Sequence, residues 1–378
     1  MRVVIASDKF KGSLSSAEVA NHLATGLAAA NGNLHVDQIQ VADGGEGTVA
    51  AVINAGYVEH VVRVSGPTGL PVEAAIAIRG NVAVIEMATA SGLALLPDGI
   101  PSPLRATSKG TGELIRAAMD KGCNRIILGA GGSACTDGGA GLLEALGAEF
   151  LDTQGQPLPP GGAALRDLAT IDLTGLDRRL RRTRFVLASD VDNPLLGANG
   201  AAQVFGPQKG ATKSQVPALE DGLAQLVHVL EQEIGPRAQK AAAAPGAGAA
   251  GGLGYAAIAI FAARRESGIK VVHELVGLDR FLAEADLVIT GEGSLDKQSL
   301  GGKTPFGISQ AAAHKGIPVV AVCGRTTLET AQLNAAGFSR IYALQDMQPD
   351  LSLCMAEAGV MLEAIGKAIG GQMVPQPA

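Results

Sequence analysis

The sequence predicts an α/β protein with two α/β domains, one a Rossmann-like parallel sheet with helices on both faces, the other a mixed α/β domain inserted into it. Three observations predict this class. Strand-like apolar runs alternate with helical stretches at both ends of the chain, these runs end in glycine-rich polar loops, and the middle carries a β-hairpin pattern. The chain has 378 residues, 47% of them hydrophobic, which is long enough to bury two cores.

The N-terminal segment has the pattern strand, loop, helix, strand. Residues 3–6 form an apolar run typical of a strand, and residues 17–27 have a helical pattern that Ser15 or Ser16 can cap. Residues 34–41 alternate in part and predict a second strand. A glycine turn and a helix that runs through Ile53 follow this strand.

The C-terminal segment has the same character. Strands are expected at residues 287–290, 318–323 and 340–344, with helices at 308–314 and 328–334. The two ends of the chain therefore predict halves of one wound sheet, a discontinuous Rossmann-like domain of residues 1–65 plus 285–378.

The middle of the chain, residues 66–284, predicts the second domain. Residues 71–78 and 82–87, joined by Arg79-Gly80-Asn81, predict a hairpin, whereas residues 125–128 predict a strand of the wound type. The alanine- and glycine-rich stretch 241–254 fits a linker. It also fits a glycine-lined helix start, because Gly251-Gly252-Leu253-Gly254 runs directly into an apolar helical pattern.

Composition excludes several classes of protein. The net charge is −6, aromatic residues make up 3% and Trp is absent, so neither a polyanion-binding face nor a base-stacking platform is expected, and no nucleic acid partner. The four cysteines lack paired spacing, which predicts reduced thiols in a cytoplasmic protein. We expect no signal peptide, and no membrane span because no breaker-free apolar stretch of about 18 residues occurs.

Five glycine-rich loops carry the candidate chemistry. The first is Asp8-Lys9-Phe10-Lys11-Gly12-Ser13, where Lys11 can add a positive charge to the N–H groups of a helix start. A solvated loop lysine is the alternative. The chain has no Walker A pattern, so a nucleotide would need another phosphate cradle.

The second loop is Asp43-Gly44-Gly45-Glu46-Gly47-Thr48. Its two carboxylates on a glycine turn can hold Mg²⁺ through water. In the alternative interpretation they only stabilise the helix that follows, Asp43 by accepting N–H groups and Glu46 by favouring the helix dipole.

The third loop runs from Gly129 to Gly139 and contains Gly131-Gly132-Ser133. It lacks the full dinucleotide fingerprint and predicts a phosphate nest, or else a tight turn with Asp137 as a helix cap. Cys135 is a candidate nucleophile only with a histidine partner, and no histidine lies in such a loop.

The fourth and fifth loops follow predicted strands. A strand that ends on Asp190 would place a carboxylate where it can accept a hydroxyl proton, whereas Asp192 or Asn193 can form an Asx-turn. The fifth loop follows residues 287–290 and combines four glycines with polar side chains. Its functional candidates are Glu292, Asp296, Gln298 and Lys303.

Taken in order, these motifs resemble the bacterial glycerate kinases of the type I family over nearly the whole chain. The resemblance implies ATP-dependent phosphorylation of D-glycerate to 2-phosphoglycerate. It rests on the loops above and on Thr107-Ser108-Lys109-Gly110-Thr111-Gly112-Glu113, Asp190-Val191-Asp192-Asn193-Pro194-Leu195, Phe205-Gly206-Pro207-Gln208-Lys209-Gly210 and Ile289-Thr290-Gly291-Glu292-Gly293.

For such a kinase we expect ATP and Mg²⁺ as cofactors. The predicted base is Asp190, with Asp296 as the rival, and Lys11 and Lys303 would stabilise the transferred phosphate. The expected metal ligands are Glu46 and Glu292, with Asp43 a further candidate. The remaining predicted substrate or phosphate contacts are Ser13, Asp43, Gly44, Gly45, Ser133, Asp137, Asn193 and Gln298, with Arg105 and Lys109 as further candidates for the glycerate carboxylate.

Two other functions remain open at this point. One is an NAD-dependent hydroxyacid dehydrogenase, which would need the full fingerprint and a loop histidine or lysine as acid. The other is a two-domain sensor of small molecules without catalysis. The composition permits a homodimer.

Overall fold

The computed structural model describes residues 1–297, 299 and 303–373, so Gln298 lies outside the described residues. The chain divides into two compact units. Unit 1 comprises Met1–Asp43, Ala50–Ala55 and Ile269–Ala378, and unit 2 comprises Gly44–Val49 and Gly56–Gly268. This division lies earlier in the chain than the expected domain limits of 65/66 and 284/285, and each unit is described by itself below.

Unit 1 is built on a five-stranded parallel sheet with the order β13-β12-β11-β1-β2. Successive connections run in opposite directions from β1, first to β2 and later to β11. Such a reversal of strand order is the point where open α/β sheets bind ligands, outside the carboxyl ends of the strands. The strands are β1 (Arg2–Ser7), β2 (His35–Gln38), β11 (Leu287–Leu295), β12 (Val319–Thr326) and β13 (Arg340–Ala343).

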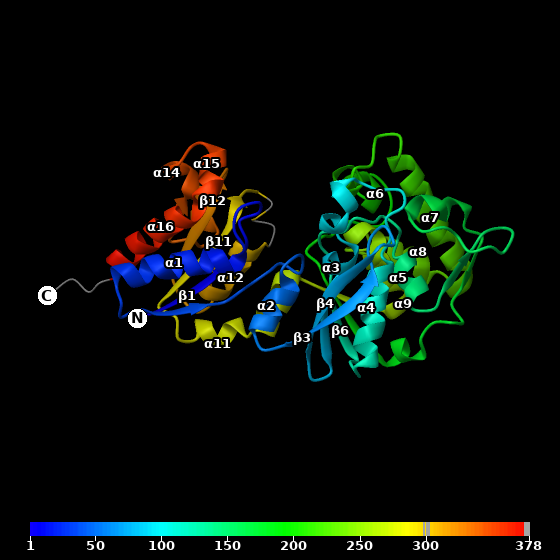
Figure 1. The fold of residues 1–378 in the computed structure, drawn as a ribbon, viewed down its shortest axis with the longest axis horizontal. Helices are drawn as coiled ribbons and strands as arrows, with labels where there is room; N and C mark the ends of the chain where they lie inside the picture. The colour runs from blue at the N-terminus through cyan, green and yellow to red at the C-terminus, as the bar shows by residue number, and fades with distance from the viewer. Residues whose placement is uncertain (298, 300–302, 374–378) are drawn as a thin grey trace. The chain divides into compact units, whose positions relative to one another are not determined.

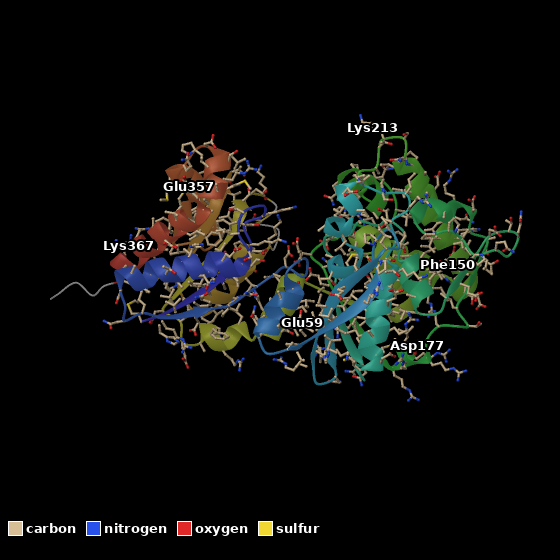
Figure 2. All side chains as sticks on the ribbon, in the orientation of Figure 1. Glu59, Phe150, Asp177, Lys213, Glu357 and Lys367 are labelled. Carbon is tan, nitrogen blue, oxygen red and sulfur yellow. The ribbon has the colours of Figure 1, made fainter. Side chains whose placement is uncertain are left out.

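Helices cover both faces of this sheet. On one face α1 (Ser16–Ala30) packs against α16 (Ala358–Gln372), and the two helices lie side by side in Figure 1. Their apolar side chains share a core with alternate strand residues such as Val3 and Ile5, whereas Lys367 of α16 is exposed to solvent (Figure 2). On the other face α12 (Thr304–Ala313) contacts β1, β11 and β12.

Unit 2 contains a six-stranded mixed sheet with the order β10-β9-β6-β5-β4-β3. Strands β3, β4 and β5 pair antiparallel, and β5, β6, β9 and β10 pair parallel. The strands are β3 (Val58–Ser65), β4 (Pro71–Arg79), β5 (Val82–Glu86), β6 (Arg125–Gly129), β9 (Arg184–Ala188) and β10 (Arg264–Glu266), and a separate hairpin consists of β7 (Glu149–Leu151) and β8 (Thr170–Asp172).

One apolar cluster forms the core of unit 2. It joins the sheet to the longer helices and includes Phe150 of the small hairpin, which is 2% exposed (Figure 2). The helices of this unit and those not yet named in unit 1 are α3 (Ala88–Ser91), α4 (Lys109–Asp120), α5 (Ala140–Ala145), α6 (Ala201–Phe205), α7 (Val216–Ile234), α8 (Arg237–Ala242), α9 (Leu253–Phe261), α10 (Gly268–Val276), α11 (Leu278–Leu282), α13 (Thr330–Ala335), α14 (Leu344–Met347) and α15 (Leu351–Ala356), and α2 (Thr48–Asn54) has residues in both units.

Several sequence-based expectations are confirmed. The mixed α/β class, the parallel sheet, the hairpin at β4 and β5 and the capping of α1 by Ser15 all hold, Ser15 and Glu18 forming a capping box. The linker interpretation of residues 241–254 is wrong. Gly252, at φ 92°, precedes α9 as its N-cap, and the stretch is largely buried.

Other expectations need correction. The strand expected at residues 34–41 covers only His35–Gln38, and β9 ends at Ala188 rather than at Asp190. Residues 58–65 form β3, which belongs to unit 2 because it pairs with β4 along its whole length. Strand β11 continues to Leu295, so the expected glycine loop begins as strand, where Glu292 is paired with Cys323.

No helix among the described residues is both long and apolar enough to cross a membrane.

The packing of α1 on α16 predicts an unusual effect of a glycine substitution. Replacing glycine by alanine inside a helix normally stabilises it by about 1 kcal/mol. A Cβ at Gly26 would instead lie 2.0 Å from the Glu363 carbonyl oxygen. We therefore expect Gly26→Ala to destabilise the protein by about 1–3 kcal/mol, measured as a lower thermal melting temperature.

Gly371→Ala is the matched control, because Gly371 lies in α16 and a Cβ there meets no atom within 4 Å. We expect its melting temperature to equal or exceed that of the parent. A Gly26→Ala variant that melts at or above the parent temperature would show that α1 and α16 do not pack this closely.

Candidate functional site

A cavity of about 510 Å³ in unit 1 lies at the carboxyl ends of β1, β11 and β12. The loops after β1 and β11 meet there, which is where the strand order reverses. Most of the lining residues are polar. They come from the loops after β1 and β11, from β11 and β12 themselves and from the segment before α2: Asp8, Lys9, Lys11, Ser13, Asp43, Glu292, Ser294, Asp296, Lys303 and Arg325.

Asp8 is the first residue after β1, and both its backbone N–H and its carboxylate form hydrogen bonds. Its backbone N–H donates to the Gly291 carbonyl oxygen at 2.9 Å, its Oδ1 accepts from the Lys9 N–H at 2.7 Å, and its Oδ2 accepts from the Thr304 hydroxyl at 3.1 Å. Burial, followed by the negative charge of Asp43, raises the pKa of Asp8 to about 6. The Asp8 carboxylate is therefore a stronger base than that of an ordinary aspartate, although it is mostly ionised at neutral pH.

Glu292 lies on β11 itself and faces the same cavity. Burial raises its pKa to about 7, and the charges of Asp8 and Asp296 act in the same direction. Among the described residues its Oε1 is buried and has no hydrogen-bond partner. A buried carboxylate oxygen without a donor is ready to receive a proton or a cation.

Positive groups line the same cavity. Lys303 is the N-cap of α12, so its side chain adds to the partial positive charge at the start of that helix. Arg325 donates through Nε to the Ser294 hydroxyl at 3.3 Å, and Lys11 is exposed on the loop after β1. A helix start with nearby lysines is suited to a phosphate group.

Asp296 and Ser299, two described residues of the segment after β11, are hydrogen-bonded to each other. The Asp296 N–H donates to the Ser299 hydroxyl at 3.0 Å, and the Ser299 N–H donates to Asp296 Oδ1 at 3.2 Å. The structure thus brings six predicted residues around one cavity, namely Lys11, Ser13, Asp43, Glu292, Asp296 and Lys303. Gln298, predicted with them, falls outside the described residues.

In unit 2, the carboxylate of Asp137 is engaged inside the fold. It is 1% exposed and accepts from the N–H groups of Ser108, Gly139 and Gly141 and from the Ser108 hydroxyl at 2.8 Å. These bonds tie the start of α4 to that of α5. Asp137 therefore holds a turn together, as the alternative interpretation of this loop expects. We do not propose Asp137 as a ligand contact.

Ser133 contacts a buried lysine, Lys209, of the motif Phe205-Gly206-Pro207-Gln208-Lys209-Gly210. Lys209 is 2% exposed, and its Nζ donates to the Ser133 hydroxyl at 2.7 Å and to the Cys135 carbonyl oxygen at 2.5 Å. Burial lowers the pKa of Lys209 to about 8. Ser133 and Lys209 line a second cavity, of about 140 Å³, with Gly131 and Gly132.

Asp190 and Asn193 lie in the loop after β9. Asp190 is half-buried, and its Oδ1 accepts from the Gly268 N–H at 3.1 Å. The Asn193 amide donates to the Asn199 carbonyl oxygen at 2.7 Å and so closes its own loop. Asp192 is 77% exposed in its side chain and pairs with Arg265 at 2.6 Å.

Gly44 and Gly131 allow close backbone packing in unit 2. Gly44 has φ +86°, and a Cβ there would lie 3.0 Å from the Ala188 carbonyl oxygen. A Cβ on Gly131 would lie 2.7 Å from Gly45 Cα. These contacts explain why glycines are needed here without a ligand.

The start of α2 is stabilised by a residue that sequence analysis missed. Glu86, at the end of β5, is 3% exposed and accepts from the N–H groups of Gly47 and Val49. Its position directly after a buried strand was the available signal. Glu46, the predicted metal ligand of this turn, is exposed.

The carboxylates of the unit 1 cavity can supply a metal ion with only a few protein ligands. Within the described residues, no group of three or more His, Cys, Asp or Glu side chains is arranged to hold a metal ion. Asp8 and Glu292 can supply hard oxygen ligands. Mg²⁺ usually takes one or two protein carboxylates and completes its shell with water and phosphate oxygens, so this donor set fits it.

Comparisons with known proteins agree over the whole chain. The model of the glycerate kinase family matches residues 3–374. The chain is 43% identical over 349 residues to a glycerate kinase of Bacillus subtilis (strain 168), which covers 91% of this chain and 90% of the relative. It is 41% identical over 347 residues to the glycerate 2-kinase of Escherichia coli (strain K12). That match covers 91% of this chain and 90% of the relative.

A solved structure is also similar. The crystal structure of a protein from Salmonella typhimurium LT2, provisionally named glycerate kinase 2, has a TM-score of 0.81 and 39% identity. The match covers 99% of this chain and 100% of that chain.

The raised pKa of Glu292 predicts a pH-dependent gain in stability on substitution. The pKa of the Glu292 carboxyl group is about 7 in the folded protein, whereas its ordinary value is 4.5. Such a group destabilises the fold once the pH exceeds 4.5, and the cost grows until the pH passes about 7. We expect Glu292→Gln to stabilise the protein by about 3 kcal/mol at pH 8 and by less than about 1 kcal/mol at pH 5.

Thermal melting at both pH values checks this, with Glu357→Gln, an exposed position, as the control that should change little at either pH. An equal shift at pH 5 and pH 8 for Glu292→Gln would mean that this carboxyl group titrates normally.

Proposed function

Because the chain belongs to the glycerate kinase family and is therefore a kinase, we propose that it transfers the γ-phosphoryl group of ATP to D-glycerate and forms 2-phosphoglycerate. The observation that carries this proposal is the unit 1 cavity, where lysines, a helix start and buried carboxyl groups surround one space at the point where the strand order reverses. Phosphoryl transfer depends mainly on positioning and charge neutralisation, which these groups can supply.

The phosphates of ATP bind in this cavity. Lys303 and the start of α12 supply positive charge from one loop, and Lys11 supplies it from another. The charge that develops on the transferred group is balanced by these fixed cations, so little rearrangement is needed during the reaction.

Asp8 and Glu292, which line this cavity, would hold Mg²⁺. Glu46, the other predicted ligand, belongs to unit 2 and does not line it. When bound, Mg²⁺ neutralises charge on the phosphate oxygens. The raised pKa values of Asp8 and Glu292 fit this role, because two buried carboxyl groups without a cation resist ionisation.

The C2 hydroxyl oxygen of D-glycerate attacks the γ-phosphorus, the bond from that phosphorus to the bridging oxygen breaks, and ADP leaves. The hydroxyl proton passes to a carboxylate, for which we prefer Asp190, with Asp296 as the rival. Asp190 is held by the Gly268 N–H through one oxygen, which fixes the orientation of its carboxylate. The carboxylate of glycerate binds near Ser133 in unit 2.

A coupled assay of ADP release tests the activity directly. We expect ADP formation with ATP and D-glycerate, and at least tenfold slower formation with L-glycerate or glycolate. Phosphorus NMR of the product should show the phosphate on C2. Absence of glycerate-dependent ADP release would end the proposal, and a product phosphorylated on C3 would correct its position.

Substitution of the base separates the two candidates. We expect Asp190→Asn to lower kcat by about 10²–10⁴ and to leave ATP binding unchanged, because an amide cannot accept the proton. Asp192→Asn, two residues away and exposed, is the control and should keep normal kcat. If Asp296→Asn loses activity while Asp190→Asn retains it, Asp296 is the base.

A further inference from the structure

The unit 1 cavity has one part without charge. The residues that line it from β11, from β12 and from the loops after β1 and β11 are mostly charged or polar. All of those contributed by the segment from α14 to the start of α16 are apolar. They are Leu344, Leu351, Cys354, Met355 and Ala358.

The same segment exposes an unusual amount of apolar surface. Five of the exposed large hydrophobic side chains of the described residues fall between Met347 and Val360. Leu351 is 54% exposed and Met355 is 37% exposed, and they are four residues apart on α15, so they share one face of that helix. Both line the cavity, whereas Leu353, 49% exposed on the same helix, does not.

The apolar part is joined to the phosphate-binding loop by direct contacts. The Ser13 hydroxyl donates to the Met355 carbonyl oxygen at 2.6 Å. A Cβ on Gly12, which has φ +81°, would lie 3.0 Å from the Met355 methyl carbon. Lys11 therefore lies one residue from a glycine that touches α15, so a ligand that meets Lys11 can also reach Met355.

We propose that the nucleobase and ribose of the nucleotide bind against Leu351 and Met355 of α15, while its phosphates reach Lys11 and Lys303. This rests on the proposed function, since it extends the same nucleotide into the same cavity. A planar apolar ring attached to a charged chain matches a cavity with an apolar part and a cationic part. The volume, about 510 Å³, suits a ligand of nucleotide size.

The thioether of Met355 and the branched side chain of Leu351 provide contacts suited to the face of a purine. Covering the base removes apolar surface of both partners from water, which is the source of the affinity. The exposure of these two side chains in the absence of ligand is then a property of the binding site.

The experiment compares a ligand that has a base with one that does not. Binding of ATP and of inorganic tripolyphosphate to the full-length protein is measured by calorimetry for the parent, Leu351→Ser, Met355→Ser and Leu353→Ser. We expect the first two variants to weaken ATP about tenfold each and to leave tripolyphosphate unchanged. Leu353→Ser, which alters the same helix away from the cavity, should leave both ligands unchanged.

Three results would overturn the inference: an unchanged ATP affinity in both cavity variants, equal weakening of ATP and tripolyphosphate, or an equal effect of Leu353→Ser. Sedimentation of the same variants identifies the other occupant, because loss of a dimer in Leu351→Ser with unchanged ATP affinity would assign α15 to a second copy of the chain. Glycerate-dependent ADP release by the parent is measured separately. If ADP is released but the variants bind ATP normally, the proposed function holds and only the nucleobase subsite is wrong.

Discussion

The pairing of β1 with β11 is the constraint on which the unit 1 site depends. Their parallel register places Ser7 opposite Gly291, and the Asp8 N–H continues the pairing to the Gly291 carbonyl oxygen at 2.9 Å. This register brings Asp8 near Glu292, and the negative charge of Asp8 adds to the burial that already raises the pKa of Glu292. Such a pair is unfavourable for the fold alone and is relieved by a bound cation, as expected of a binding site.

The glycine-rich loops of unit 2 differ from those of unit 1 in what they do. Gly44 and Gly131 serve close backbone contacts, and Asp137 is satisfied by N–H groups of its own surroundings. Among the described loops of unit 2, the one at Ser133 lies at a cavity beside a buried lysine, Lys209. The same sequence pattern therefore has a structural role at Gly44, Gly131 and Asp137, whereas a ligand contact at Ser133 stays a prediction.

Much of the fold followed from local pattern, because apolar runs and glycine-rich turns mark strands that are buried on both faces. The extension of β11 to Leu295 did not, because Gly291 and Gly293 look like loop residues until β12 is known to pair beside them. The roles of Asp8, Glu86 and Lys209 were missed for a related reason. Each role depends on burial and on partners distant in sequence, such as Thr304 for Asp8. Neither burial nor distant partners can be seen in the local sequence.

The central claim is that the unit 1 cavity binds the phosphates of ATP with a divalent cation at Glu292. Anomalous diffraction from crystals grown with Mn²⁺ and a non-hydrolysable ATP analogue tests it most directly. We expect a manganese peak in bonding contact with the Glu292 carboxylate and phosphate density beside Lys303. Well-ordered nucleotide elsewhere, with this cavity holding only solvent, would contradict it.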